Sequence, residues 1–348
     1  MAPTRCAMWA ALGLLLLSSQ VFSQVLPQVA FAAASDAKAQ HPLVSIRADH
    51  MVIDLIMLGN ELLVGTQSGR VDVYDRTTGD ALAPLYFEPA ASGEGFAPTV
   101  RSLAIAPGGA ELAVVTSDGM LRRFALKLGA GAAEARLMSE RKFPSLMVAR
   151  YLDDRRILLG DMRGELALVD TQTGVELHRR QLDYDPIYAM ELSPDRSLLA
   201  LAFRSSRVQI VEPASGETQQ VLKGHLDSVF DLEWISDHEL ATASKDKQLY
   251  VWDLRDSDPR PRSLYHGDHY ITALGIDRIG GRLALPLDGF DVGLLTLRDQ
   301  QIEQRLEGHT APVQRLLFFD RGRQLISAGY DARVFVWELE PPQNVRRR

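Results

Sequence analysis

Cysteine is almost missing from this chain, since Cys6 is the only one among 348 residues. One thiol cannot build a disulfide framework or a site of clustered thiolate ligands for a metal. An excess of basic residues is missing too, because 38 lysines and arginines stand against 45 aspartates and glutamates. The net charge of −7 excludes the basic surface that a nucleic-acid-binding protein needs. A composition of 46% hydrophobic and 24% charged residues excludes a disordered chain, a collagen-like fibre and a multi-span membrane protein.

An apolar run occupies residues 8–17, after Arg5 and with no acidic residue before it. This layout is typical of a secretory signal peptide, and the run is shorter than the ~20 residues that span a bilayer. A second apolar stretch at 25–34 offers small residues for cleavage between 32 and 34, while cleavage after Ser23 and retention as an anchor stay open. We expect residues 1–34 to be a signal peptide that directs the chain to the periplasm. Its removal would take away Cys6, which suits an oxidising compartment.

Two segments near the C-terminal end repeat one pattern. Residues 250–253 and 335–338 each form an alternating strand that ends in Trp followed by an acid, and a Gly-His pair stands 27 and 28 residues before the two tryptophans. At this point the sequence resembles the WD40-repeat family, whose repeats begin with Gly-His, end with Trp-Asp and span ~40 to 45 residues. The resemblance implies a β-propeller that binds partners rather than an enzyme.

The same unit can be traced through the rest of the chain by one marker position, that of the tryptophan. An apolar Leu or Ile stands twelve residues before every marker, and tight-turn residues recur five or six residues before several of them. The seven markers are Tyr74, Phe124, Val169, Val211, Trp252, Leu297 and Trp337. Each repeat contains short alternating segments separated by turns, such as 100–106, 111–116 and 120–126 in the second. The sequence therefore predicts an all-β, seven-bladed propeller of four-stranded antiparallel blades.

The last repeat ends at its third strand, because Pro341 and Pro342 cannot continue a central strand. Residues 43–46 alternate and belong to no repeat, so we expect this N-terminal segment to complete blade seven and close the ring. The domain boundaries that follow are a propeller over 41–340 and a tail over 341–348, in a monomer. The connections at 88–98 and 127–142 are rich in Ala and Gly and are expected to be surface loops.

The resemblance also implies a hydrogen-bonded chain of four side chains within a blade. Carried over by position, these are His225, Thr242, Asp246 and Trp252 in blade five, and His309, Ser327, Asp331 and Trp337 in blade seven. They look like a catalytic triad, but we interpret them as structural. Blade six retains half of the set, His269 and Asp291. His266 and His269 could also form a two-histidine metal pair, which we set aside because no third ligand is predicted.

Two positions per blade are expected to project from the face that such propellers use for binding. The first, after the leading apolar residue of the inner strand, holds Ile53, Arg101, Met147, Tyr188, Phe230, Thr272 and Gln314. The second, before the turn Asp, holds Gln67, Ser117, Met162, Arg204, Lys245, Phe290 and Tyr330. Aromatic residues and arginine dominate interface energetics. The predicted partner-binding face is therefore Arg101, Tyr188, Arg204, Phe230, Lys245, Phe290 and Tyr330; the alternative is that some of these side chains plug the channel.

No enzyme motif for phosphate, serine or metal chemistry is present, so the sequence predicts a non-catalytic scaffold that binds another periplasmic protein without cofactor or metal. Two alternatives stay open. One is a periplasmic propeller enzyme or cofactor carrier similar to quinone-cofactor dehydrogenases, which share the Thr-Gly pairs seen at 78–79 and 173–174. The other is an accessory factor of a periplasmic reductase system such as nitrate reductase.

Overall fold

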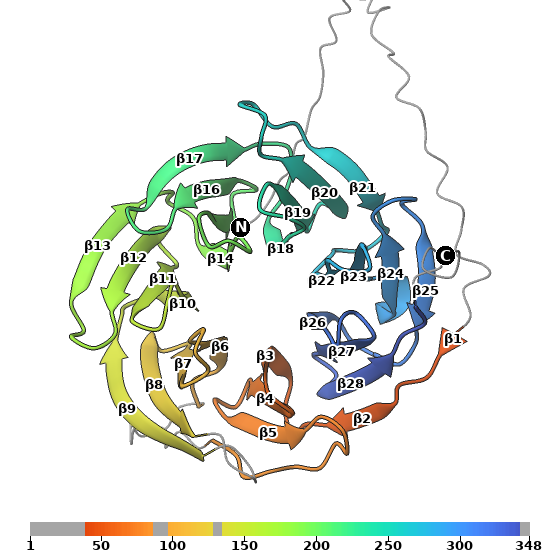
Figure 1. The fold of residues 1–348 in the computed structure, drawn as a ribbon, viewed down its shortest axis with the longest axis horizontal. Coiled ribbons are helices and arrows are strands. Elements are labelled where there is room, and N and C mark those ends of the chain that lie inside the picture. Colours follow the sequence, from red (N-terminus) through yellow and green to blue (C-terminus); the bar gives the residue numbers. More distant parts are fainter. Residues whose placement is uncertain (1–38, 86–96, 128–133, 342–348) are drawn as a thin grey trace, which may run out of the picture. The chain divides into compact units, whose positions relative to one another are not determined.

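The computed structural model describes residues 39–85, 97–127 and 134–341. The predicted signal peptide and most of the tail lie outside these ranges, as does most of the predicted loop at 88–98. The described chain forms seven mainly antiparallel sheets of three to five strands, joined in sequence order. It is a seven-bladed β-propeller with almost no helix, as the sequence predicts (Figure 1).

In blades one to five the strands run in chain order from the centre of the ring outward, and in blades six and seven an N-terminal strand lies outside the others. Blade one contains β3 Val52–Leu58, β4 Glu61–Thr66 and β5 Val71–Asp75, and blade two contains β6 Val100–Ile105, β7 Glu111–Thr116, β8 Met120–Lys127 and β9 Glu134–Lys142. Blade three contains β10 Leu146–Tyr151, β11 Arg156–Asp161, β12 Glu165–Asp170 and β13 Glu176–Gln181. Blade four contains β14 Ile187–Leu192, β15 Leu199–Phe203, β16 Val208–Glu212 and β17 Glu217–Leu222. Blade five contains β18 Val229–Trp234, β19 Glu239–Ser244, β20 Gln248–Asp253 and β21 Arg262–His266. Blade six contains β22 Gly275–Asp277, β23 Arg282–Pro286, the 3₁₀ turn η1 Asp288–Phe290, β24 Val292–Thr296 and β25 Ile302–Leu306. Blade seven contains β26 Val313–Phe319, β27 Gln324–Gly329 and β28 Arg333–Glu338.

The ring is closed by the N-terminal segment. Strand β2, Val44–Arg47, pairs antiparallel with β28 and supplies the outer strand of blade seven, with Val44 opposite Val336. The inner strands also contact one another around the whole ring, and β26 of the last blade touches β3 of the first. The predicted closure by residues 43–46 is therefore confirmed.

The outer edges of three blades have features that were not predicted from the sequence. The segment 127–142, predicted as a surface loop, contains β9, which pairs along β8 from Met120 to Lys127. In blade one, residues 81–85 cover the edge of β5 through isolated bridges at Ala81 and Leu85. A two-residue strand, β1 Ala39–Gln40, lies parallel to β25 and adds a fifth strand to the sheet of blade six.

The core lies between the blades. The buried apolar side chains form seven clusters, and each cluster is drawn from two neighbouring blades. Blades two and three, for example, meet through Val115 and Leu159. Because each blade depends on both neighbours, closure by β2 completes the burial of the whole ring. No helix in the described part of the chain is long and apolar enough to cross a membrane.

Candidate interaction site

The inner strands carry an irregularity at the same place. In six blades the ladder between the first and second strands shifts by one residue immediately after the first residue of the inner strand. The extra residue is left out of the pairing, which redirects its side chain. These residues are Ile53, Arg101, Met147, Tyr188, Phe230 and Gln314. Thr272 takes the corresponding place just before β22 in blade six.

All seven of these side chains line one cavity of about 430 Å³ at one end of the central channel. Tyr270 and Tyr330 also line it, and both are exposed. We call these nine residues the mouth surface. The structure thus brings together four residues of the predicted partner-binding face: Arg101, Tyr188, Phe230 and Tyr330.

Two more residues of the predicted face stand at the turns between the second and third strands. Arg204 is exposed, and its carbonyl accepts a hydrogen bond from the Ser228 hydroxyl at 3.1 Å. The ammonium of Lys245 lies 3.3 Å from an Asp227 carboxylate oxygen and 5.8 Å from the ring centre of Tyr270. Neither residue lines the cavity, although Lys245 borders the mouth surface through Tyr270.

The position given to Phe290 within its turn is wrong by two residues. In blade five the marker Trp252 pairs with the residue twelve before it, Leu240. Blade six pairs Leu295 with Leu283, so the marker there is Leu295 rather than Leu297.

The backbone of the three-residue turn gives the same register. Its third residue has a positive φ in every blade: Gly69 82°, Gly119 81°, Gly164 76°, Ser206 68°, Lys247 71°, Phe290 71° and Ala332 59°. Phe290 is therefore the third turn residue, and Asp288 is the first. For the same reason Asp291 does not occupy the Asp position of the four-residue set. It instead accepts a hydrogen bond from Arg305 at 2.7 Å, and His269 is exposed.

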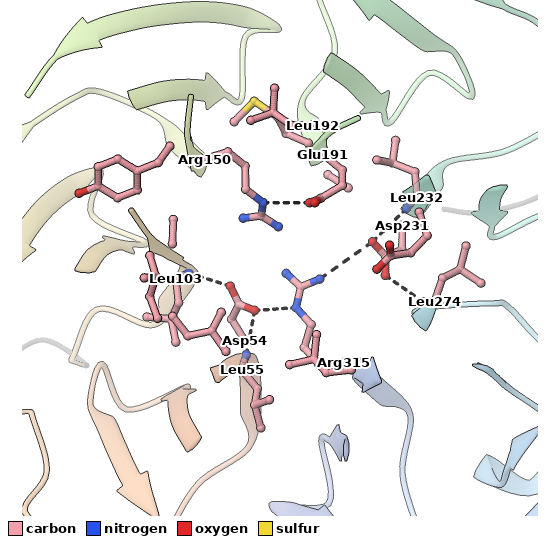
Figure 2. Close-up of a pocket in the computed structure, with 18 of the residues that line it drawn as sticks. Asp54, Leu55, Leu103, Arg150, Glu191, Leu192, Asp231, Leu232, Leu274 and Arg315 are labelled. Carbon is pink, nitrogen blue, oxygen red and sulfur yellow. Dashed lines mark hydrogen bonds and ion pairs between the residues drawn. The ribbon is translucent and has the colours of Figure 1, made fainter. Parts of the chain in front are cut away.

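Below the mouth surface, charged side chains cross the channel (Figure 2). Asp54 accepts hydrogen bonds from the backbone N–H groups of Leu55, at 2.8 Å, and Leu103, at 2.7 Å, in the next blade. Arg315 donates to the same carboxylate at 2.6 Å and reaches to 4.0 Å from Asp231. These contacts tie the inner strands of neighbouring blades together.

Asp231 repeats the role of Asp54 in blade five. It accepts from the N–H groups of Leu232, at 3.0 Å, and Leu274, at 2.9 Å, the latter in blade six. Arg150 and Glu191, on the inner strands of the adjacent blades three and four, form another ion pair at 3.2 Å (Figure 2).

Burial changes the acid–base behaviour of these groups. Loss of water around Glu233, followed by repulsion from Glu191 and Asp231, raises the pKa of Glu233 well above its usual value. Burial also raises the pKa of Asp231, against the attraction of Arg315. Burial opposes the charge on Arg315, but Asp54 and Asp231 outweigh it and raise the pKa of that guanidinium.

This channel network was not predicted from the sequence. Its signal is present, because charged residues stand two and four places after the first residue of several predicted inner strands, at Asp54, Glu191, Asp231, Glu233 and Arg315. A strand that is buried on both faces seldom carries charge unless the charge is paired.

Both four-residue hydrogen-bonded sets are formed. In blade five, His225 Nδ1 lies 2.8 Å from Asp246 and Nε2 lies 2.7 Å from the Thr242 hydroxyl, which also accepts the Trp252 indole N–H at 2.9 Å. Burial acts to raise the pKa of Asp246, but hydrogen bonds from His225 and the Leu226 amide prevail and lower it. The set thus links the beginning of the blade to its second and third strands.

Blade seven repeats the arrangement. His309 lies 2.9 Å from Asp331 and 2.8 Å from Ser327, whose hydroxyl accepts the Trp337 N–H at 2.8 Å. The order Asp, His, Ser is that of a hydrolase triad, yet Ser327 is completely buried and its oxygen is occupied by Trp337. A nucleophile needs access to its substrate, so this geometry supports packing rather than acyl transfer.

Across residues 39–85, 97–127 and 134–341, no group of three or more His, Cys, Asp or Glu side chains could hold a metal ion. His266 and His269 are both exposed, on either side of Gly267 and Asp268.

Comparison with known proteins matches the two regions that contain these sets. The family described as "WD domain, G-beta repeat" matches residues 216–253 and 300–338. The chain contains WD40 repeats. Each matched repeat begins near the outer strand of one blade and ends with the third strand of the next. Repeats and blades are therefore offset by one strand, so blade seven needs β2 as its outer strand. The other blades have a similar order of antiparallel strands, but the family model does not match them.

Several named proteins are similar over part of their length. Periodic tryptophan protein 2 of Arabidopsis thaliana is 28% identical over 185 residues, which cover 51% of this chain and 20% of that protein. DDB1- and CUL4-associated factor 10 of Homo sapiens is 23% identical over 217 residues, 62% of this chain and 31% of that protein. Nuclear distribution protein PAC1 of Arthroderma benhamiae is 26% identical over 175 residues, 47% of this chain and 38% of that protein. The matched regions thus cover only about a fifth to two fifths of these relatives.

Proposed function

We propose that this chain is a non-catalytic scaffold that binds another protein through the mouth surface. The observation that carries the proposal is that all seven blades direct one side chain into the same cavity. Tyr188 and Phe230, from neighbouring blades, stack there with ring centres 6.2 Å apart. Aromatic side chains that are ordered before binding lose little entropy on association.

The similar proteins support a binding role in general terms. They are similar to this chain over part of their length, and the name of DDB1- and CUL4-associated factor 10 records an association with other proteins. The buried and occupied Ser327 and Thr242 argue against hydrolysis by the triad-like sets.

The test is affinity purification of the tagged full chain from the organism that makes it. The Tyr188→Ala/Phe230→Ala double variant should recover its partner at least tenfold less well than the natural chain, because both anchors are removed. Leu177→Ala/Val221→Ala, which changes two exposed residues on the outer strands β13 and β17, is the matched control and should recover the partner normally. Equal recovery by both double variants would contradict the proposal.

We also propose that the chain is exported to the periplasm, where it would meet its partner. The support is the apolar run at 8–17 after Arg5, together with the small residues at 30–34. The relatives compared are eukaryotic and do not bear on this location. Mass spectrometry of the protein from a periplasmic fraction should give an N-terminus between residues 24 and 35, and a retained Trp9 peptide would contradict cleavage.

A further inference from the structure

Charge is unevenly matched at the mouth of the channel. The cavity there is lined by Arg101, Arg150 and Arg315 but by only one carboxylate, Asp231. Asp231 is already engaged by two backbone N–H groups. Deeper carboxylates satisfy two of the arginines, because Glu191 pairs with Arg150 and Asp54 with Arg315.

Arg101 is the exception. The hydrogen bond that its guanidinium makes is to the Met147 thioether, at 3.1 Å, and its Nε is buried without a partner. Within the described ranges, no carboxylate lies within 4.0 Å of it. The Arg101 guanidinium is half-buried. Because a thioether is a weak acceptor, Arg101 has no strong protein acceptor within the described ranges.

The missing partner fits a carboxylate. A guanidinium and a carboxylate form paired, charge-assisted hydrogen bonds, which gain strength where water is partly excluded. One unpaired guanidinium neutralises one negative charge, which matches a carboxylate better than a dianionic phosphate.

Apolar surface lies beside this charge. Tyr188 and Phe230 stack in the same cavity, and Ile53 and Met147 are among its other apolar lining residues. A ligand that uses both features carries an acidic group next to a large apolar group. An extended peptide presents them on nearby residues, since adjacent side chains can enter the cavity from a segment that lies across the mouth.

We propose that the mouth surface recognises an acidic side chain, Asp or Glu, in an extended peptide segment of the partner. Arg101 binds the carboxylate, while Tyr188 and Phe230 hold a neighbouring aromatic or large aliphatic residue. This inference rests on the proposed function and adds the chemical class of the partner segment.

The experiment begins with a library of random 12-residue peptides displayed without a free C-terminus and selected on the full chain. Enriched peptides are synthesised with an amidated C-terminus, and their affinity is measured by fluorescence anisotropy. We expect the peptides to share an Asp or Glu close to an apolar residue. Changing that acid to its amide should weaken binding roughly 10- to 100-fold, as loss of a charge-assisted hydrogen bond predicts.

The variant Arg101→Met should bind the acidic peptide more weakly than the natural chain, by a similar factor. It should bind the amide form of the peptide with the same affinity as the natural chain. Arg101→Lys keeps the charge without the paired geometry and should fall between them. A thermal melt of each variant shows that the propeller is intact.

Two results separate the acidic specificity from the proposed face. Suppose that the peptides do not bind Tyr188→Ala/Phe230→Ala, yet their affinity changes neither with the amide substitution nor with Arg101→Met. This result would overturn the acidic specificity but would still support binding through the mouth surface. Peptides that bind this double variant as well as the natural chain would overturn both.

Discussion

At the scale of single residues, the buried His225 and His309 each connect strands within one blade through hydrogen bonds. His225 bonds Asp246 and Thr242 with its two ring nitrogens, and Thr242 in turn accepts from Trp252. The positions of these residues could be predicted from sequence, because Gly-His and Trp recur at nearly fixed spacing. Their role as a hydrogen-bonded set was implied only by the resemblance to WD40 repeats, and the structure now shows the hydrogen bonds.

Replacing His225 with alanine should lower the free energy of unfolding by roughly 2 to 3 kcal/mol, since Asp246 and Thr242 each lose a buried partner. His238→Ala, in the same blade but exposed, should change it by less than about 0.5 kcal/mol. Urea denaturation of both variants measures the difference. Equal losses would show that the hydrogen-bonded set contributes little.

Glu233 gives the channel a pH dependence. Its pKa is raised in the folded chain, where Glu191, Asp231, Arg278 and Arg315 surround it, so the folded state keeps a proton that the unfolded state releases. The stability it contributes is complete below the unfolded pKa and is lost as the pH rises through the folded pKa.

Glu233→Gln cannot ionise at this position, so the variant does not lose this stability as the pH rises. The free energy of unfolding of the variant minus that of the natural chain should therefore be larger at about pH 7 than at about pH 4, as measured by denaturation across this range. Glu217→Gln, an exposed change on β17, serves as the control and should show no such gain. A constant difference between Glu233→Gln and the natural chain at every pH would contradict the assignment.

At the scale of elements, the inner three strands of each blade were predictable and the outer ones less so. Strands β6 and β7 are rich in apolar residues because they are buried between neighbouring blades. The outer strand β9 is exposed along most of its length on both faces, so its sequence carries no apolar period to detect. That is why 127–142 was predicted as a loop.

Blade six shows a second limit. Its register was misplaced by two residues, and a shift of two leaves the alternation of inward and outward side chains unchanged. Leu297 and Leu295 satisfy the apolar pattern equally well, and no tryptophan marks the correct one. Only the observed strand pairing and the positive φ of Phe290 distinguish them.

The turn between β7 and β8 provides a test of this element. Gly119 has a φ of +81°, and a Cβ added there would stand 2.5 Å from the Phe143 carbonyl oxygen. Gly119→Ala should therefore lower the free energy of unfolding by roughly 2 to 4 kcal/mol. Gly109, in the same blade with a φ of +72°, has open space around it, so Gly109→Ala should cost about 1 kcal/mol. Chemical denaturation that ranks the two variants equally would contradict the close approach.

At the scale of the whole molecule, seven blades that share their cores with their neighbours make a rigid ring, and β2 closes it. The number of blades followed from the repeat spacing, and the closure followed from the missing fourth strand of the last repeat. The ion pairs across the channel could not be predicted as contacts, because Arg315 and Asp231 lie 84 positions apart in the sequence and in blades that are not adjacent. The ring gives the mouth surface a fixed geometry.

The measurement that most directly tests the central claim is site-specific photocrosslinking in cells that make the protein. A photoreactive amino acid is placed at Gln314 in the mouth surface or, as the control, at the exposed Val221 on outer strand β17. We predict that a partner protein is crosslinked from Gln314 and not from Val221. Crosslinking of the partner from Val221, with none from Gln314, would contradict binding through the mouth of the channel.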